Sequence, residues 1–153
     1  MKRIIVFMFA LILLTGSALA SGLEDLIAEH NIACIATGAA LITGDPEISE
    51  GRYVYSITDQ VKIHFNMDGE TFKSFSCVCL DDSGIGEFLA QCVASFYTLG
   101  GIDAYSSCYG PVLMDFLSVR SGFPAGNNSS VSGFLFRIVK ESYGYTFIIV
   151  KVK

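Results

Sequence analysis

The segment 61–67 alternates strictly between apolar and polar residues, which is the pattern of a β-strand with one buried face. Its apolar members are Val61, Ile63, Phe65 and Met67. The run 52–58 before it alternates in a similar way, and Asp68-Gly69 after it is a turn signal, because glycine tolerates the positive φ of tight hairpins. A third β-rich run, 70–80, follows. The three runs predict an antiparallel meander.

The third run does not keep one apolar face. If Asp68-Gly69 forms a two-residue turn, the cysteines of this strand lie on the face opposite Phe65. Either a β-bulge near Lys73-Ser74 shifts the alternation, or both faces of the sheet are covered at this end. Because Val78, at an alternate position, is apolar as well, we expect cover on both faces.

Helical periodicity follows the meander. Apolar residues repeat at intervals of three and four from about Ser83 to Gly100-Gly101, which predicts a helix. The segment 103–107 is expected to be a loop. A second helix is predicted to begin with Pro111 in its first turn and to end at Ser121-Gly122.

The two ends of the domain predict different elements. Ser21 is a suitable N-cap for a short helix that carries Leu26 and His30 on one face, whereas 32–42 is compatible with a helix or a buried strand. At the other end, 134–140 and 145–152 are rich in β-branched and aromatic residues and predict a hairpin.

This order of elements predicts one α+β domain over 21–153. Its antiparallel sheet has about five strands, from the meander and the terminal hairpin, and helices pack on it. Strands and helices occur in separate runs, which argues against a doubly wound parallel sheet. The order of the strands in the sheet does not follow from the sequence.

Residues 1–20 have the features of a secretory signal peptide. Lys2 and Arg3 precede an apolar run, Ile4 to Leu14, and Ala18-Leu19-Ala20 fits a cleavage site. As a helix this run reaches about 16 Å, roughly half of a hydrocarbon core about 30 Å thick, so a permanent membrane span is not expected. We therefore expect cleavage after Ala20 and a secreted or periplasmic protein.

Charge limits the partners of such a protein. The chain has 10 basic and 15 acidic residues, and removal of Lys2 and Arg3 leaves a net charge of -7 from 8 basic and 15 acidic residues. Nucleic acids and anionic membranes reward clusters of Lys and Arg. We therefore expect a protein or another envelope component as partner, and no nucleic acid.

All five cysteines follow the signal segment, where an oxidising compartment would favour disulfides. Measured outward from the turn at Ser83, Cys79 on the strand and Cys92 on the helix are both about 13 Å away. The geometry predicts Cys79-Cys92 first and Cys77-Cys108 second, with Cys34 unpaired. The alternative is that all five are small buried thiols.

Motifs for catalysis or metal binding are weak. Cys77-Val-Cys79 lacks the gap of common zinc sites, and His30 and His64 are the two histidines that could pair with a cysteine. The acidic pair Asp81-Asp82 is typical of a helix start. Three further carboxylates form a solvated loop: Asp45, Glu47 and Glu50. We predict no catalytic residue, no metal site and no cofactor.

Tyrosines offer a different kind of site. Six of them concentrate near strand starts and loops, where tyrosine supplies binding area at low entropic cost: Tyr53, Tyr55, Tyr105, Tyr109, Tyr143 and Tyr145. The leading hypothesis is a non-catalytic binding or inhibitor-like module that uses an exposed sheet face or loop cluster. The alternatives are a small exported hydrolase that uses a cysteine or carboxylate, and a structural envelope protein.

Overall fold

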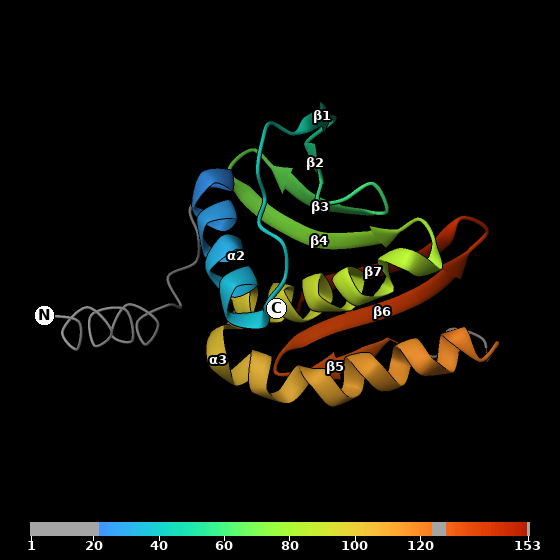
Figure 1. The fold of residues 1–153 in the computed structure, drawn as a ribbon. Coiled ribbons are helices and arrows are strands. Elements are labelled where there is room, and N and C mark those ends of the chain that lie inside the picture. Colours follow the sequence, from blue (N-terminus) through green and yellow to red (C-terminus); the bar gives the residue numbers. More distant parts are fainter. Residues whose placement is uncertain (1–21, 124–127, 153) are drawn as a thin grey trace, which may run out of the picture.

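The computed structural model describes residues 22–123 and 128–152, which form an α+β fold with a seven-stranded antiparallel sheet and two helices (Figure 1). The predicted signal segment, 1–20, lies outside the described residues. The elements in chain order are α2 (Leu23–Thr37), β1 (Glu47–Ser49), β2 (Arg52–Ser56), β3 (Val61–Asp68), β4 (Thr71–Cys79), the 3₁₀ turn η1 (Asp82–Gly84), α3 (Ile85–Arg120), β5 (Ser129–Val131), β6 (Phe134–Glu141) and β7 (Gly144–Lys151). The α+β class and the antiparallel sheet are confirmed.

The expected number of about five strands is too low, because the described residues contain two further strands at the edges of the sheet. β1 and β5 have three residues each, and each is joined to its neighbour by a two-residue turn with positive φ at both positions. These turns are Glu50-Gly51 and Ser132-Gly133. Glycine is favoured there because it adopts positive φ at low cost. Both segments are short and mostly polar, so their sequence is typical of loops.

Helix α2 settles the open question at 32–42. The helix continues to Thr37 and ends where Gly38 adopts φ 76°. The following residues have no regular structure until β1 begins. The N-cap is Gly22, without a side-chain hydrogen bond, and not the predicted Ser21, which lies outside the described residues.

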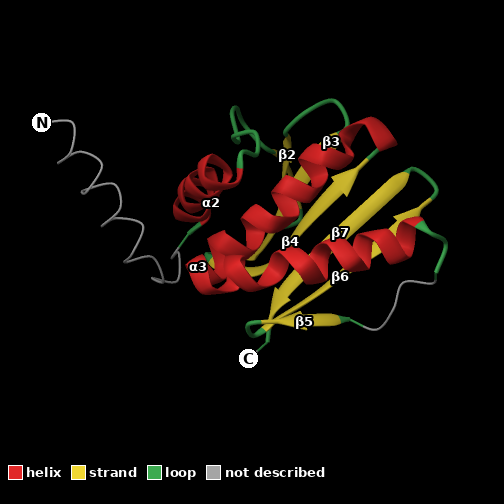
Figure 2. Ribbon diagram, turned by 60° about the horizontal axis from the view of Figure 1, so that its bottom comes forward, coloured by secondary structure: helices red, strands yellow, loops and turns green. Residues whose placement is uncertain are grey.

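The predicted meander is present, but β3 and β4 pair in a different register from the one that a simple two-residue turn predicts. Met67 on β3 pairs with Phe72 on β4, whereas Asn66 pairs with Ser74, so the pairing skips Lys73. This β-bulge turns the rest of β4 so that its two cysteines share the inward face of β3. The described helices lie on that one face (Figure 2). Of the two alternatives, the β-bulge is therefore present, and the expectation that helices cover both faces is wrong.

Helix α3 bends sharply at Gly101, whose φ of 67° and ψ of -160° are not helical. The first limb, 85–100, confirms the predicted helix. The second limb, 102–120, begins directly after the bend, so the predicted loop at 103–107 is helical and Pro111 lies inside the limb. The left-handed φ explains why a glycine stands at the bend. Both limbs lie against the same face of the sheet (Figure 2).

The strand order is β1-β2-β3-β4-β7-β6-β5, so the terminal hairpin is inserted beside β4 and all neighbours are antiparallel. The main core lies between this sheet and the helices, and its largest fully buried members are mostly aromatic. They include Phe65, Phe75, Phe88, Phe96, Phe116, Phe136 and Phe147. Several of these rings meet edge to face, such as Phe96 and Phe136 at 5.4 Å between centroids.

Candidate functional site

The face of the sheet that points away from the described helices is a candidate binding surface, which we call the open face (Figure 2). The antiparallel register arranges its outward side chains in rows across β3, β4, β7 and β6. One row consists of Lys62, Val78, Thr146 and Val139, and the next of His64, Ser76, Ile148 and Arg137. In both rows β3 contributes a polar residue, whereas β4, β7 and β6 contribute polar and apolar residues in turn.

The β3 part of the open face is polar and internally bonded. Asn66 donates a hydrogen bond to the Ser74 hydroxyl (2.9 Å) and accepts one from Arg52 (3.2 Å). Burial, together with the positive charges of Arg52 and Lys62, lowers the pKa of His64. The imidazole is therefore neutral at pH 7 and adds no positive charge to this part of the face.

β4, β7 and β6 together carry the apolar residues of the open face, which we call the apolar strip. Its members are Val78, Leu135, Val139, Ile148 and Val150. Ile148 is 37% exposed, and the other four are half-buried. A solvated face of an antiparallel sheet is normally polar, so the apolar strip is a candidate contact site.

Positive charge borders the apolar strip. Lys62 lies in the row of Val139, and Arg137 lies in the row of Ile148. Neither forms an ion pair with any described residue. Arg137 also lines a hollow of about 250 Å³ together with Asn128, Leu135, Phe136, Ile148 and Val150. This hollow therefore combines an apolar floor with a cation and an amide, which suits an apolar group that carries a carboxylate.

The six tyrosines predicted as a binding surface do not form one surface. Tyr55 and Tyr145 are buried on the inward face of the sheet, at 4% and 3% exposure, and the half-buried Tyr53 packs against the same main core from β2. Tyr143 is exposed at the β6–β7 turn, where its hydroxyl lies 3.1 Å from that of Thr146. The remaining two belong to a separate site on α3.

That separate site is an apolar groove between the two limbs of α3, with a volume of about 290 Å³. Its lining comprises Thr37, Gly86, Leu89, Ala90, Val93, Tyr105, Tyr109, Val112 and Leu113. Tyr109 is 65% exposed and Tyr105 half-buried. The groove has no charged side chain in its lining, so it offers less chemical selectivity than the hollow at Arg137.

His30 joins α2 to α3 in a fully buried polar cluster. Its ring nitrogens lie 2.9 Å from the Thr98 hydroxyl and 2.8 Å from the Gln91 side-chain oxygen. Gln91 in turn donates to Glu87 and to the backbone oxygen of Ala40, both at 2.8 Å. Burial lowers the pKa of His30 to about 4. At neutral pH this imidazole is uncharged, and both of its nitrogens lie within hydrogen-bond distance of side chains of the first limb of α3.

All five cysteines are buried thiols, and no two of them lie at disulfide distance in the described part of the chain. Burial raises the pKa of Cys34 to about 12 and that of Cys108 to about 11, and it also raises the pKa values of Cys79 and Cys92. Thiols of this kind stay protonated at neutral pH. The predicted Cys79-Cys92 and Cys77-Cys108 bonds remain predictions.

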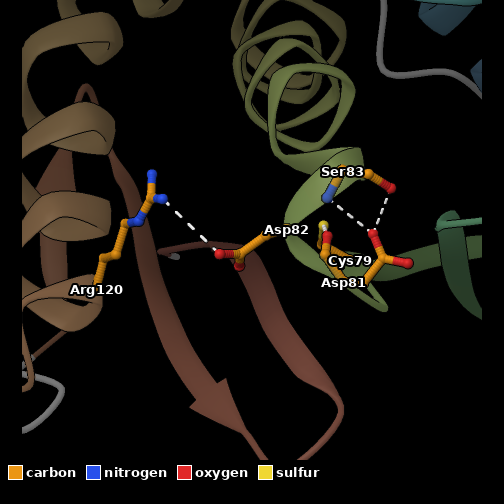
Figure 3. Close-up of polar contacts among 5 residues, drawn as sticks. All are labelled: Cys79, Asp81, Asp82, Ser83 and Arg120. Atoms are coloured by element: carbon orange, nitrogen blue, oxygen red, sulfur yellow. Dashed lines mark hydrogen bonds and ion pairs between the residues drawn. The ribbon is translucent and has the colours of Figure 1, made fainter.

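The acidic pair Asp81-Asp82 lies at the start of the 3₁₀ turn η1, just before α3, where the sequence predicts a helix start. Asp81 accepts hydrogen bonds from the backbone nitrogen and the hydroxyl of Ser83, at 2.8 and 2.5 Å (Figure 3). These bonds lower the pKa of Asp81. Asp82 lies 3.8 Å from Arg120, so the start of the first limb meets the end of the second. The three loop carboxylates, by contrast, are at or beside the exposed edge strand β1.

The described residues contain neither a cluster of metal-binding side chains nor a helix suited to cross a membrane. Within 22–123 and 128–152 no group of three or more acidic, histidine or cysteine side chains could hold a metal ion. No helix in this part is both long and apolar enough to span a bilayer. Among known proteins, no family model, no curated sequence and no solved structure matches this chain.

Proposed function

We propose that the protein is a non-catalytic binding module of the periplasm or cell envelope, and that the open face binds a protein partner. The observation that carries the proposal is the apolar strip bordered by Lys62 and Arg137. Binding of a partner removes these apolar side chains from water, which stabilises the complex by about 25 cal/mol per Å² of buried apolar surface. The strip supplies this driving force, and the two cations supply orientation.

The charge pattern favours a partner segment that carries both apolar side chains and carboxylates. The chain without its signal segment has a net charge of -7, yet two of the three charges beside the apolar strip, Lys62 and Arg137, are positive and form no ion pair with a described residue; the third is Glu141, two residues from Val139 on β6. Such local reversal of charge selects acidic partners and rejects basic ones. The overall negative charge also argues against nucleic acid.

The hydrolase alternative receives less support. A nucleophilic cysteine needs a thiolate, whereas burial raises the pKa of four of the five thiols. His30 is held between Thr98 and Gln91, and His64 lies on the open face. A binding role makes no demand on these groups, so it fits their burial.

The test is affinity capture from the native envelope, followed by mass spectrometry, with three baits. They are the mature wild-type protein, Ile148→Asp in the apolar strip, and His64→Asp in the same row but on β3. We expect wild type and His64→Asp to enrich the same protein, and Ile148→Asp to lose it. Circular dichroism of each bait confirms that the variants are folded.

Two results would overturn the proposal. One is reproducible failure of the wild-type bait to enrich any protein. The other is equal enrichment by Ile148→Asp, which would move the binding surface away from the apolar strip. A captured partner is then divided into peptides, and the binding peptide must contain both apolar and acidic residues.

A further inference from the structure

The hollow at Arg137 lies where three strands meet on the open face. Arg137 on β6 pairs with Ile148 on β7, and Leu135, two residues before Arg137, pairs with Val150. Asn128 directly precedes β5, whose first residue pairs with the residue next to Arg137. The register therefore places a guanidinium and an amide at one border of a floor that contains three aliphatic side chains.

Both polar groups of the hollow are available to a ligand. Among the described residues, neither the Asn128 amide nor the Arg137 guanidinium has a hydrogen-bonding or ion-pair partner, and both side chains are exposed. A guanidinium can donate two parallel hydrogen bonds to a carboxylate, and an amide N–H can add a third. The acidic residue of β6, Glu141, is four residues away along the strand, or about 13 Å.

The volume of the hollow limits what can occupy it. At about 250 Å³, the hollow is smaller than most small-molecule sites, which have roughly 300 to 1,000 Å³. It therefore suits one end of a larger molecule and not a whole ligand of drug size. That end must carry its apolar group and its carboxylate close together, because the Cβ atoms of cross-strand partners such as Arg137 and Ile148 are only about 5 Å apart.

We propose that this hollow binds the C-terminal residue of a polypeptide partner, with the free carboxylate on Arg137 and Asn128 and an apolar side chain on the floor. An apolar C-terminal residue carries both groups on the same Cα. In an internal segment the two groups belong to different residues, and side chains that share a face of an extended chain are about 6.6 Å apart. The inference rests on the proposed function, because it names the part of the protein partner that the open face recognises.

The test is an NMR titration of the isotope-labelled mature protein with three N-acetylated pentapeptides, each to about 10 mM, because contacts of one residue are weak. The first is Gly-Ser-Gly-Ser-Leu with a free C-terminus, and the second is the same peptide with a C-terminal amide. The third, Gly-Ser-Leu-Asp-Gly with a C-terminal amide, has the charge of the first but carries its carboxylate inside the chain. We expect the first peptide to shift the backbone resonances of Leu135, Arg137 and Ile148, and to bind about tenfold more tightly than the other two.

Three variants assign the contacts. Arg137→Gln should bind the free-acid peptide about tenfold less tightly, at the level of the amide, because it removes the charge that holds the carboxylate. Arg120→Gln removes the same charge on the helical side and should keep the preference for the free acid. Ile148→Ala should weaken binding of the free acid and of the amide by the same factor, because the floor contacts the side chain that both peptides share. A two-dimensional NMR spectrum of each variant checks that it is folded.

The outcomes separate this inference from the proposed function. Equal affinity for the free-acid and the internal Leu-Asp peptide would overturn the inference, but it would leave the open face as a site for an internal acidic segment. The inference is also wrong if the free-acid peptide shifts none of the three resonances, or if Arg137→Gln keeps the preference for the free acid. Affinity capture, which uses whole partner proteins, tests the proposed function separately.

Discussion

The inward and outward faces of β7 carry almost equally apolar residues but lie in different surroundings. Tyr145, Phe147 and Ile149 point toward the helices and are at most 3% exposed, whereas Ile148 points away and is 37% exposed. On β3 the two faces differ already in the sequence, because Lys62, His64 and Asn66 occupy its outward positions. The outward Ile148 on β7 contributes little to the main core, and it belongs to the surface that we propose as the binding site.

The largest expected effect is on stability, and it separates two neighbouring residues on opposite faces of β7, Phe147 and Ile148. Phe147→Ala should lower the free energy of unfolding by about 3 to 5 kcal/mol, because it leaves a cavity in the main core. Ile148→Ala should lower it by about 1 kcal/mol or less. Urea denaturation measures both values. Equal losses would mean that the open face is covered in the folded protein.

The next effect is the pH dependence of stability, and it compares His30, on the helical side of the sheet, with His64, on the open face. The unfolded chain binds a proton at His30 below about pH 6.5, whereas the native state does so only below about pH 4. The free energy of unfolding should therefore be greatest above pH 6.5 and fall by about 3 kcal/mol as the pH drops to 4.

Denaturation curves between pH 7 and pH 4 measure this loss, and two variants assign it. His30→Gln should remove most of the pH dependence, even if the variant is less stable throughout. His64→Gln should remove much less, since His64 is half-exposed and its pKa is lowered only by partial burial and nearby charge. An unchanged slope in His30→Gln would contradict the assignment.

A smaller effect is expected at the border of the sheet. The Asp115 carboxylate accepts a hydrogen bond from the backbone nitrogen of Ile138 (3.0 Å), at a point on β6 beyond the last residue paired with β5. Asp115→Ala leaves this donor unpaired and should lower the free energy of unfolding by about 1 to 2 kcal/mol. Asp82→Ala, which removes an exposed ion pair, should change it by less than about 0.5 kcal/mol in the same assay.

The smallest expected effect is on the binding of a small probe to the apolar strip. Anilinonaphthalene sulfonate carries an apolar ring system and one negative charge, which match the hollow at Arg137. Arg137→Glu should weaken binding about fivefold, or about 1 kcal/mol, in a fluorescence titration. Arg120→Glu makes the same change of charge on the helical side and should leave binding unchanged. Equal weakening by both variants would indicate a general charge effect.

The elements with a clear period were predictable. The strand at 61–67, the helix from about Ser83 to Gly100 and the terminal hairpin are confirmed with boundaries close to the prediction. The second limb of α3 was misplaced at its start, because the serines near its first turn resemble a loop. There, Ser106 and Ser107 donate side-chain hydrogen bonds to backbone oxygens of their own helix.

The candidate site was less predictable. The run Phe147 to Val150 is apolar without alternation, so it indicates a strand but not which of its faces a helix covers. The tyrosines near strand starts were the stronger surface signal, yet Tyr55 and Tyr145 face the core. Side-chain type alone cannot distinguish an aromatic residue that packs in a sheet from one that binds a partner.

The sequence by itself determined the α+β class, the meander, the first limb of α3 and the terminal hairpin, because each depends on local periodicity and turn chemistry. The tertiary structure decided three things: the place of β7 beside β4, the bulge at Lys73, and hence which apolar residues face away from the helices. These depend on pairing between segments far apart in the chain. A shift of one residue there moves a whole row of side chains to the other face of the sheet.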